Sequence, residues 1–190
     1  MRGGWWEDLL SRRCAFPIAP LNTWSNLAYL AVGVAAYSLR PTPWGLAIGA
    51  LFGALALASG WYHGVKTLVS SRADNAGIYA LLTALWLHAG GNQVLPSVLI
   101  ATVVAGVLAF GPYWKKTLEP VVVVLGAVTP AVTAVRGSLA LTAISFALVA
   151  AAFAAWQMDR QRTFPWPRWG HAVWHVLTAA ALLLLFLAAP

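Results

Sequence analysis

The residues best suited to chemistry lie near the end of the sequence, where His171 and His175 open the last hydrophobic stretch. Side chains four residues apart lie on one face of a helix, about one turn from each other. This spacing lets two imidazoles bind one metal ion without bending the backbone. Because polar side chains are costly at the start of a membrane helix, the pair favours a functional role.

Three further polar residues lie where two other hydrophobic stretches meet: His63 and Ser59 at the end of one, and Asp74 at the start of the next. Three neutral imidazoles with an open coordination position are the ligand set of catalytic zinc, which activates water and polarises a carbonyl group. We therefore predict that Zn²⁺ is bound by His63, His171 and His175. Asp74 is expected to act as general base and then as acid, with a role as fourth ligand as the alternative. Ser59, one helical turn before His63, is expected to hydrogen-bond the oxyanion.

Other roles for these residues stay open. A HxxxH pair alone is a weak signal, and buried histidines also join structural hydrogen-bond networks. Haem ligation is the less favoured alternative because it needs two imidazoles opposed across a porphyrin, whereas an i, i+4 pair points one way. Ser59 equally fits close helix packing. His88, near a predicted helix end, is interpreted as an interfacial or capping residue.

The composition indicates that these residues lie on membrane helices. The chain is 61% hydrophobic and 9% charged, whereas soluble domains carry about 25% charged residues. Runs of about 20 apolar residues recur along its length. The sequence therefore predicts an all-α membrane protein, a seven-transmembrane-helix bundle with an intramembrane zinc site. We expect an interfacial N-terminal lead at residues 1–21 and a seven-helix transmembrane hydrolase domain at residues 22–190.

The distribution of charge predicts the orientation of the helices. The predicted spans are residues 22–39, 44–65, 73–89, 95–110, 117–135, 139–158 and 171–189. All but two of the 12 Lys and Arg residues lie on the side of the N-terminus, and the exceptions are Arg40 and Arg136. By the positive-inside rule the N-terminus and the zinc site are cytoplasmic, and the C-terminus is outside.

The same charges do not indicate a nucleic-acid partner, although the net charge is +7. The basic residues stand singly or in pairs in short loops, which is typical of membrane anchoring. Nothing in the loops marks a protein partner. Cys14 is the only cysteine, so neither an intrachain disulfide nor a cysteine-rich metal site is expected.

The combined motif resembles the CREST superfamily of seven-span membrane hydrolases, which includes alkaline ceramidases, GPI-remodelling enzymes and the PAQR receptors. The match covers most of the chain, from Trp5 to His175. Its segments are Ser59-Gly60-Trp61-Tyr62-His63, Asp74, His171-Ala172-Val173-Trp174-His175 and, similar to alkaline ceramidases, Asn22-Thr23-Trp24-Ser25-Asn26-Leu27. The resemblance implies zinc held by the three histidines, with Ser59 and Asp74 in the catalytic centre.

The resemblance also sets the expected activity. We expect a zinc-dependent hydrolase that cleaves an amide, or an ester, in a ceramide-like or other acyl lipid. The alternative is a PAQR-like membrane receptor or sensor with a structural zinc site, and the predicted orientation agrees with that branch. Of the acidic calcium site of alkaline ceramidases only Glu7 clearly matches, so calcium has little support.

Overall fold

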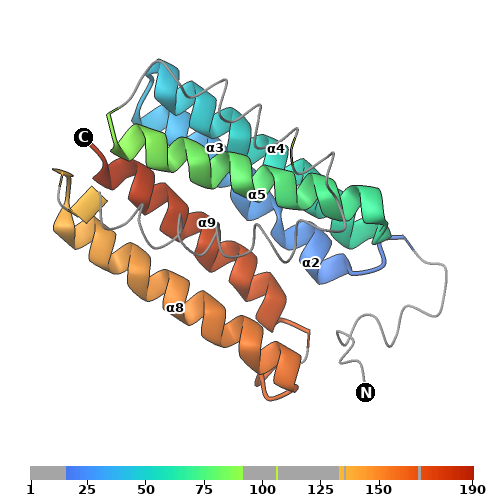
Figure 1. Ribbon diagram of the computed structural model, residues 1–190. Helices are drawn as coiled ribbons and strands as arrows, with labels where there is room; N and C mark the ends of the chain where they lie inside the picture. Colours follow the sequence, from blue (N-terminus) through green and yellow to red (C-terminus); the bar gives the residue numbers. More distant parts are fainter. Residues whose placement is uncertain (1–15, 92–105, 107–132, 135, 167) are drawn as a thin grey trace.

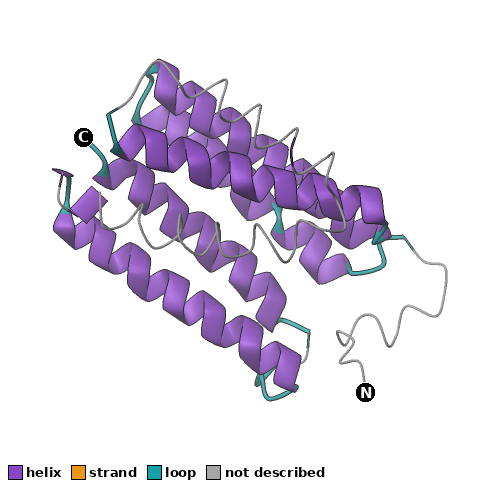
Figure 2. Cartoon of the chain, viewed as in Figure 1, coloured by secondary structure: helices purple, strands orange, loops and turns teal. Residues whose placement is uncertain are grey.

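The computed structural model describes residues 16–91, 106, 133–134, 136–166 and 168–190, and every regular element within them is an α-helix (Figures 1 and 2). The all-α class is therefore confirmed for this part of the chain. The helices are α2 (Pro20–Ser25), α3 (Leu27–Leu39), α4 (Pro43–Val65), α5 (Leu68–Ala89), α8 (Leu139–Gln161) and α9 (Gly170–Ala188).

Among the described residues, three helices are long and apolar enough to cross a membrane, namely α4, α8 and α9. They coincide with predicted spans 44–65, 139–158 and 171–189 and support a membrane protein. The predicted spans 95–110 and 117–135, and most of the N-terminal lead, lie outside the described residues. Seven spans and the orientation therefore stay predictions.

Two predicted loops are wrong at their edges because the adjoining helices extend into them. The predicted loop 66–72 is mostly helix, since α5 begins at Leu68. Thr67 and Ser70 form a reciprocal capping box, in which each side chain bonds the backbone N–H of the other. Likewise α8 passes its predicted end at residue 158 and ends before Arg162, which is left-handed with φ 62°. Apolar composition predicts the hydrophobic part of each helix, whereas capping determines the residue at which the helix begins or ends.

The predicted first span is divided into α2 and α3, which meet at Asn26. The Asn26 side chain donates to the Asn22 carbonyl at 2.6 Å. The 13 residues of α3 are about 20 Å long, which is shorter than the ~30 Å hydrocarbon core. The single predicted helix is therefore corrected to two consecutive helices.

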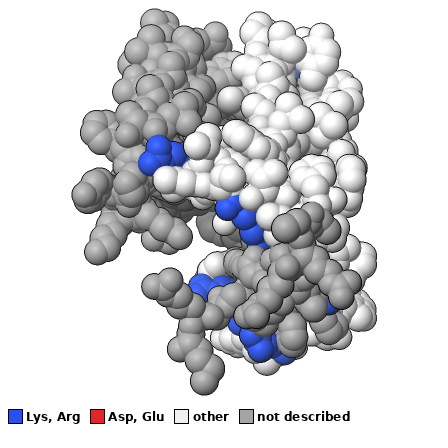
Figure 3. Space-filling model, turned by 90° about the vertical axis from the view of Figure 1, so that its right-hand side faces the viewer, with Lys and Arg blue, Asp and Glu red and all other residues white. Residues whose placement is uncertain are grey.

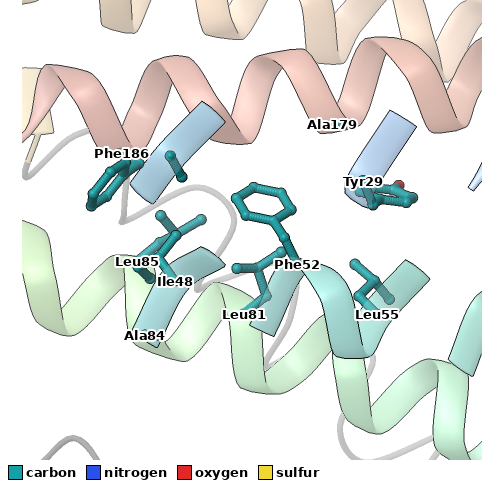
Figure 4. Close-up of a cluster of buried hydrophobic side chains, with 10 residues drawn as sticks. Tyr29, Ile48, Phe52, Leu55, Leu81, Ala84, Leu85, Ala179 and Phe186 are labelled. Carbon is teal, nitrogen blue, oxygen red and sulfur yellow. The ribbon is translucent and has the colours of Figure 1, made fainter. Parts of the chain in front are cut away.

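The helices pack side by side, with α9 against α8 and α3, and with α4 against α3 and α5. Figure 1 shows the α4–α5 and α8–α9 links at one end of the bundle and the C-terminus at the other. Buried side chains fill the space between α5 and α9 (Figure 4), including Phe52, Leu81 and Phe186. Burying such side chains joins the helices that carry His63 and His175 to one common core.

Glycines set the distance between α3 and α4. A Cβ atom on Gly49 would lie 2.7 Å from the Gly33 carbonyl oxygen, and a Cβ on Gly33 would lie 2.7 Å from the Gly49 carbonyl oxygen. These backbones approach each other more closely than any larger residue allows. On the same helix, a Cβ on Gly53 would meet nothing nearer than a Leu30 methyl at 4.0 Å.

Because Gly49 is crowded and Gly53 is not, alanine substitutions at these two positions form a matched test of the packing between α3 and α4. Alanine gains about 1 kcal/mol of helix propensity over glycine at either position. In Gly49→Ala that gain is opposed by an overpacking cost of about 1–3 kcal/mol. We expect thermal melting of the purified protein in detergent to show a lower Tm for Gly49→Ala and an unchanged or higher Tm for Gly53→Ala. Equal melting of the two variants would contradict the close approach.

Candidate metal centre

Two distant parts of the chain bring three histidines to one end of the bundle. His63 lies in the last turn of α4, and His171 and His175 lie in the first two turns of α9. His63 is 5% exposed, His175 is 3% exposed and His171 is half-buried. The predicted meeting of these three histidines is present in the structure.

The three imidazoles are arranged as a metal ligand set. The Nε2 atoms of His63 and His171 lie 3.2 Å apart, and the three ring centroids are separated by 4.7 to 5.0 Å. One ligand atom from each residue falls within 4.8 Å of the other two. Two nitrogens bound to one tetrahedral zinc ion would lie about 3.3–3.4 Å apart. The group can therefore bind a metal ion.

Backbone hydrogen bonds fix the end of α4, where His63 lies. The N–H groups of Ala19 and Ile18 donate to the carbonyls of His63 and Gly64, at 3.1 and 3.0 Å. Carbonyls in the last turn of a helix have no partner within the helix, so these bonds satisfy them. Gly64 is small enough for the Phe16 ring to approach, since a Cβ there would lie 2.9 Å from it. The segment before α2 is thereby attached to His63.

A buried carboxylate fixes the start of α9. Asp159 is 5% exposed and accepts the backbone N–H groups of Gly170 and His171. A Cβ on Gly170 would lie 2.5 Å from the Asp159 Cβ and 2.6 Å from the Ala155 carbonyl oxygen. Only glycine allows α8 and α9 to meet so closely, and negative charge is favourable at a helix N-terminus. Asp159 therefore holds His171 in place.

Sequence reasoning missed Asp159, which it placed in a charged loop at residues 159–168. The residue instead belongs to the last turn of α8. The usable signal was Gly170 beside His171, since a glycine at a helix start indicates close backbone approach.

Ser25 is a second residue that sequence reasoning left without a role. Its hydroxyl oxygen lies 2.7 Å from His175 Nδ1. The residue stands in the Asn22–Leu27 motif quoted above for its resemblance alone. The sequence feature that could have indicated Ser25 is the polarity of this motif at the edge of a hydrophobic run.

Ser59 and Asp74 lie together beside the histidines. Ser59 is buried one turn from His63 on α4, and a side-chain hydrogen bond joins it to Asp74 on α5. Asp74 Oδ1 is buried and has no hydrogen-bond partner among the described residues. Asp74 is not in the metal-ligand group, which among the described residues contains histidines alone. The geometry favours Asp74 as base over Asp74 as fourth ligand.

The Ser59 hydroxyl was expected to hydrogen-bond an oxyanion, but it hydrogen-bonds Asp74 instead. It donates its single proton to the Asp74 carboxylate, because a carboxylate can only accept. In this state Ser59 orients Asp74, and its proton is not available to an oxyanion.

The fourth histidine lies apart from this group. His88 is in the last turn of α5, with its ring centroid 5.3 Å from that of Trp44 and 5.0 Å from that of Phe186. It packs among aromatic rings at the end of the bundle where Arg40 contacts Phe186. His88 therefore serves as an internal control for the metal centre. Glu7, the remaining candidate for calcium, lies outside the described residues.

Basic side chains surround the end of the bundle that carries the histidines. Figure 3 shows Lys and Arg side chains on this face, with no Asp or Glu visible among the residues described there. The α4–α5 and α8–α9 segments contribute Lys66, Arg72, Arg160, Arg162 and Arg168. The two acidic residues of this region, Asp74 and Asp159, point into the protein.

No family model, curated protein or solved structure matches this chain. The residues and the geometry of this site are therefore the only indications of its function.

Metal analysis of single variants tests the ligand set. The wild type is expected to carry about one tightly bound ion per chain, and each alanine variant of His63, His171 and His175 to lose most of it, because two imidazoles hold a metal weakly. Inductively coupled plasma mass spectrometry of the purified proteins measures this content. His88→Ala, the matched control, should retain the ion. Equal metal in His88→Ala and His171→Ala would exclude the three-histidine site.

Proposed function

We propose that this protein is a zinc-dependent intramembrane hydrolase that cleaves an amide, or an ester, of an acyl lipid, as alkaline ceramidases of the CREST superfamily do. The proposal rests on one observation above all. Three histidines with a ligand geometry lie next to a buried Ser59–Asp74 pair.

The donor set favours zinc. Three neutral imidazoles with no thiolate are typical of catalytic zinc sites, whereas calcium and magnesium prefer oxygen ligands. When bound, zinc polarises the acyl carbonyl and lowers the pKa of a coordinated water. His63, His171 and His175 would hold the ion, and the open position would face the substrate.

Asp74 would accept and then donate the proton that is transferred in the reaction. Its Oδ1 atom has no hydrogen-bond partner in the part of the chain that the structure describes and would take the proton from the attacking water as general base. The protonated Asp74 would then give that proton to the departing amine or alcohol. This sequence conserves protons and needs no other residue.

Ser59 would respond to the charge on Asp74. While Asp74 is ionised, Ser59 donates to it. Once Oδ1 of Asp74 carries the proton, the oxygen that Ser59 bonds is no longer charged and accepts more weakly, so the hydroxyl proton of Ser59 becomes available to the oxyanion. The predicted oxyanion role of Ser59 is thus retained, but only after the first proton transfer.

The depth of the site fits the acyl linkage of a lipid. His63 is two residues from the end of α4, and His175 is five residues into α9. At 1.5 Å per residue, both lie within about 10 Å of the helix ends. Amide and ester groups of membrane lipids occupy this boundary between head groups and acyl chains. The exposed apolar side chains of α4 and α9, such as Leu57 and Val176, would contact the acyl chains.

The activity is tested by measuring fatty acid released from a panel of lipids that contains ceramides, other N-acyl lipids and acyl esters. We expect the wild type to release fatty acid from at least one of these lipids. Asp74→Asn should lower the rate by about 10²–10⁴-fold, because an amide cannot accept the proton.

Metal content is the control for this experiment. Asp74→Asn should keep the ion, since the carboxylate is not a ligand, whereas His171→Ala should lose both the ion and activity. Equal release by the wild type and by metal-free His171→Ala would refute the hydrolase. No release from any lipid, with a lower Tm on metal removal, would instead favour the receptor with a structural zinc site.

A further inference from the structure

A chain of hydrogen bonds connects His175 to the backbone of α2. The Ser25 hydroxyl oxygen lies 2.7 Å from His175 Nδ1 and 3.1 Å from the Asn22 carbonyl oxygen. The Asn26 side chain donates to the same carbonyl at 2.6 Å. His175 also hydrogen-bonds the Asn22 backbone. The Asn22 carbonyl is therefore the common acceptor of this network.

The direction of the bonds follows from the acceptor at its end. A carbonyl oxygen has no proton to give, so Ser25 donates its single proton to Asn22. The Ser25 oxygen can then only accept from His175, which requires the proton of the imidazole to reside on Nδ1. The bond from His175 to the Asn22 backbone requires the same proton. Nε2 of His175 is consequently left with its lone pair.

We propose that Ser25 is a positioning residue of the metal centre, which holds His175 as the Nδ1–H tautomer with Nε2 directed at the ion. The proposal rests on the metal site of the proposed function and adds the residue that orients one of its ligands. Metal-ligating histidines almost always donate their second N–H to such a partner, which fixes the ring and raises its basicity. By contrast, His63 Nδ1 is buried and has no hydrogen-bond partner within residues 16–91, 133–134, 136–166 and 168–190.

The break between α2 and α3 serves this arrangement. Asn26 is 1% exposed, and its side-chain bond holds the Asn22 carbonyl that Ser25 and His175 share. α2 packs against both α4 and α9, the helices of the three histidines. The Asn22–Leu27 motif thereby acquires a physical role, which is to carry an oriented acceptor to His175.

A second contact between the same parts of the chain provides the matched control. Tyr29 on α3 bonds Thr178 on α9 at 2.6 Å, within a turn of both Ser25 and His175. Tyr29→Phe removes one buried hydrogen bond between α3 and α9 but leaves the Nδ1 bond of His175 in place. A merely structural role for Ser25 would make the two variants alike.

The experiment titrates the metal-free, purified full chain with Co²⁺ and records the visible absorption spectrum, which reports coordination geometry. Ser25→Ala should bind Co²⁺ about 10–100-fold more weakly than the wild type, with an altered spectrum. Ser25→Thr keeps the hydroxyl and should restore both. Tyr29→Phe should keep the wild-type spectrum and affinity, although its Tm falls.

The outcomes separate the two proposals. Wild-type spectrum and affinity in Ser25→Ala would overturn the positioning role and leave the metal site intact. Failure of the wild type to bind Co²⁺ or Zn²⁺ would overturn the metal site itself. Should Ser25→Ala fail to fold, ¹⁵N NMR of histidine side chains in the zinc-loaded wild type tests directly which ring nitrogen of His175 carries the proton. It should show a protonated Nδ1 on His175, and a protonated Nε2 would overturn the proposal.

Discussion

The burial of three imidazoles at one end of an apolar bundle is the constraint on which the rest of the structure depends. Polar groups removed from water are costly unless they find partners. The Nε2 atoms of His63 and His171 lie 3.2 Å apart, and Nδ1 of His175 contacts the Ser25 hydroxyl. A metal ion held by the three histidines would satisfy the facing nitrogens together, which would account for imidazoles and carboxylates gathering there in a chain with few ionisable residues.

The supporting structure holds each histidine by its backbone as well as by its ring. The segment before α2 bonds the carbonyl of His63, and the carboxylate of Asp159 accepts the N–H of His171. Gly170 allows α8 to approach the start of α9. These contacts do not touch the reacting groups, yet they determine where the ligands lie. Because a ligand set tolerates displacements of only a few tenths of an ångström, rigid helix ends suit it better than loops do.

The Ser59–Asp74 pair places a hydrogen-bonded carboxylate beside the histidines, which a structural metal site does not need. One oxygen of this buried carboxylate bonds Ser59, and the other has no partner among the residues described, an arrangement that suits the proton exchange proposed above. In the proposed hydrolase, its place on α5, outside the ligand group, would separate metal binding from proton transfer. The position of the centre near the helix ends would then match the depth at which acyl linkages of lipids lie.

The sequence by itself determined the helical class, the bounds of α4, α8 and α9 to within a few residues, and the three histidines that meet. Apolar runs and an i, i+4 spacing are local patterns, and helix direction then places His63 beside His171. Tertiary structure decided the division at Asn26, the place of Asp74 outside the ligand group, and the contacts of Ser25 with His175 and of Asp159 with the start of α9. Those features depend on where side chains from different helices point. Such directions are set by packing between segments up to 150 residues apart, and no local pattern encodes them.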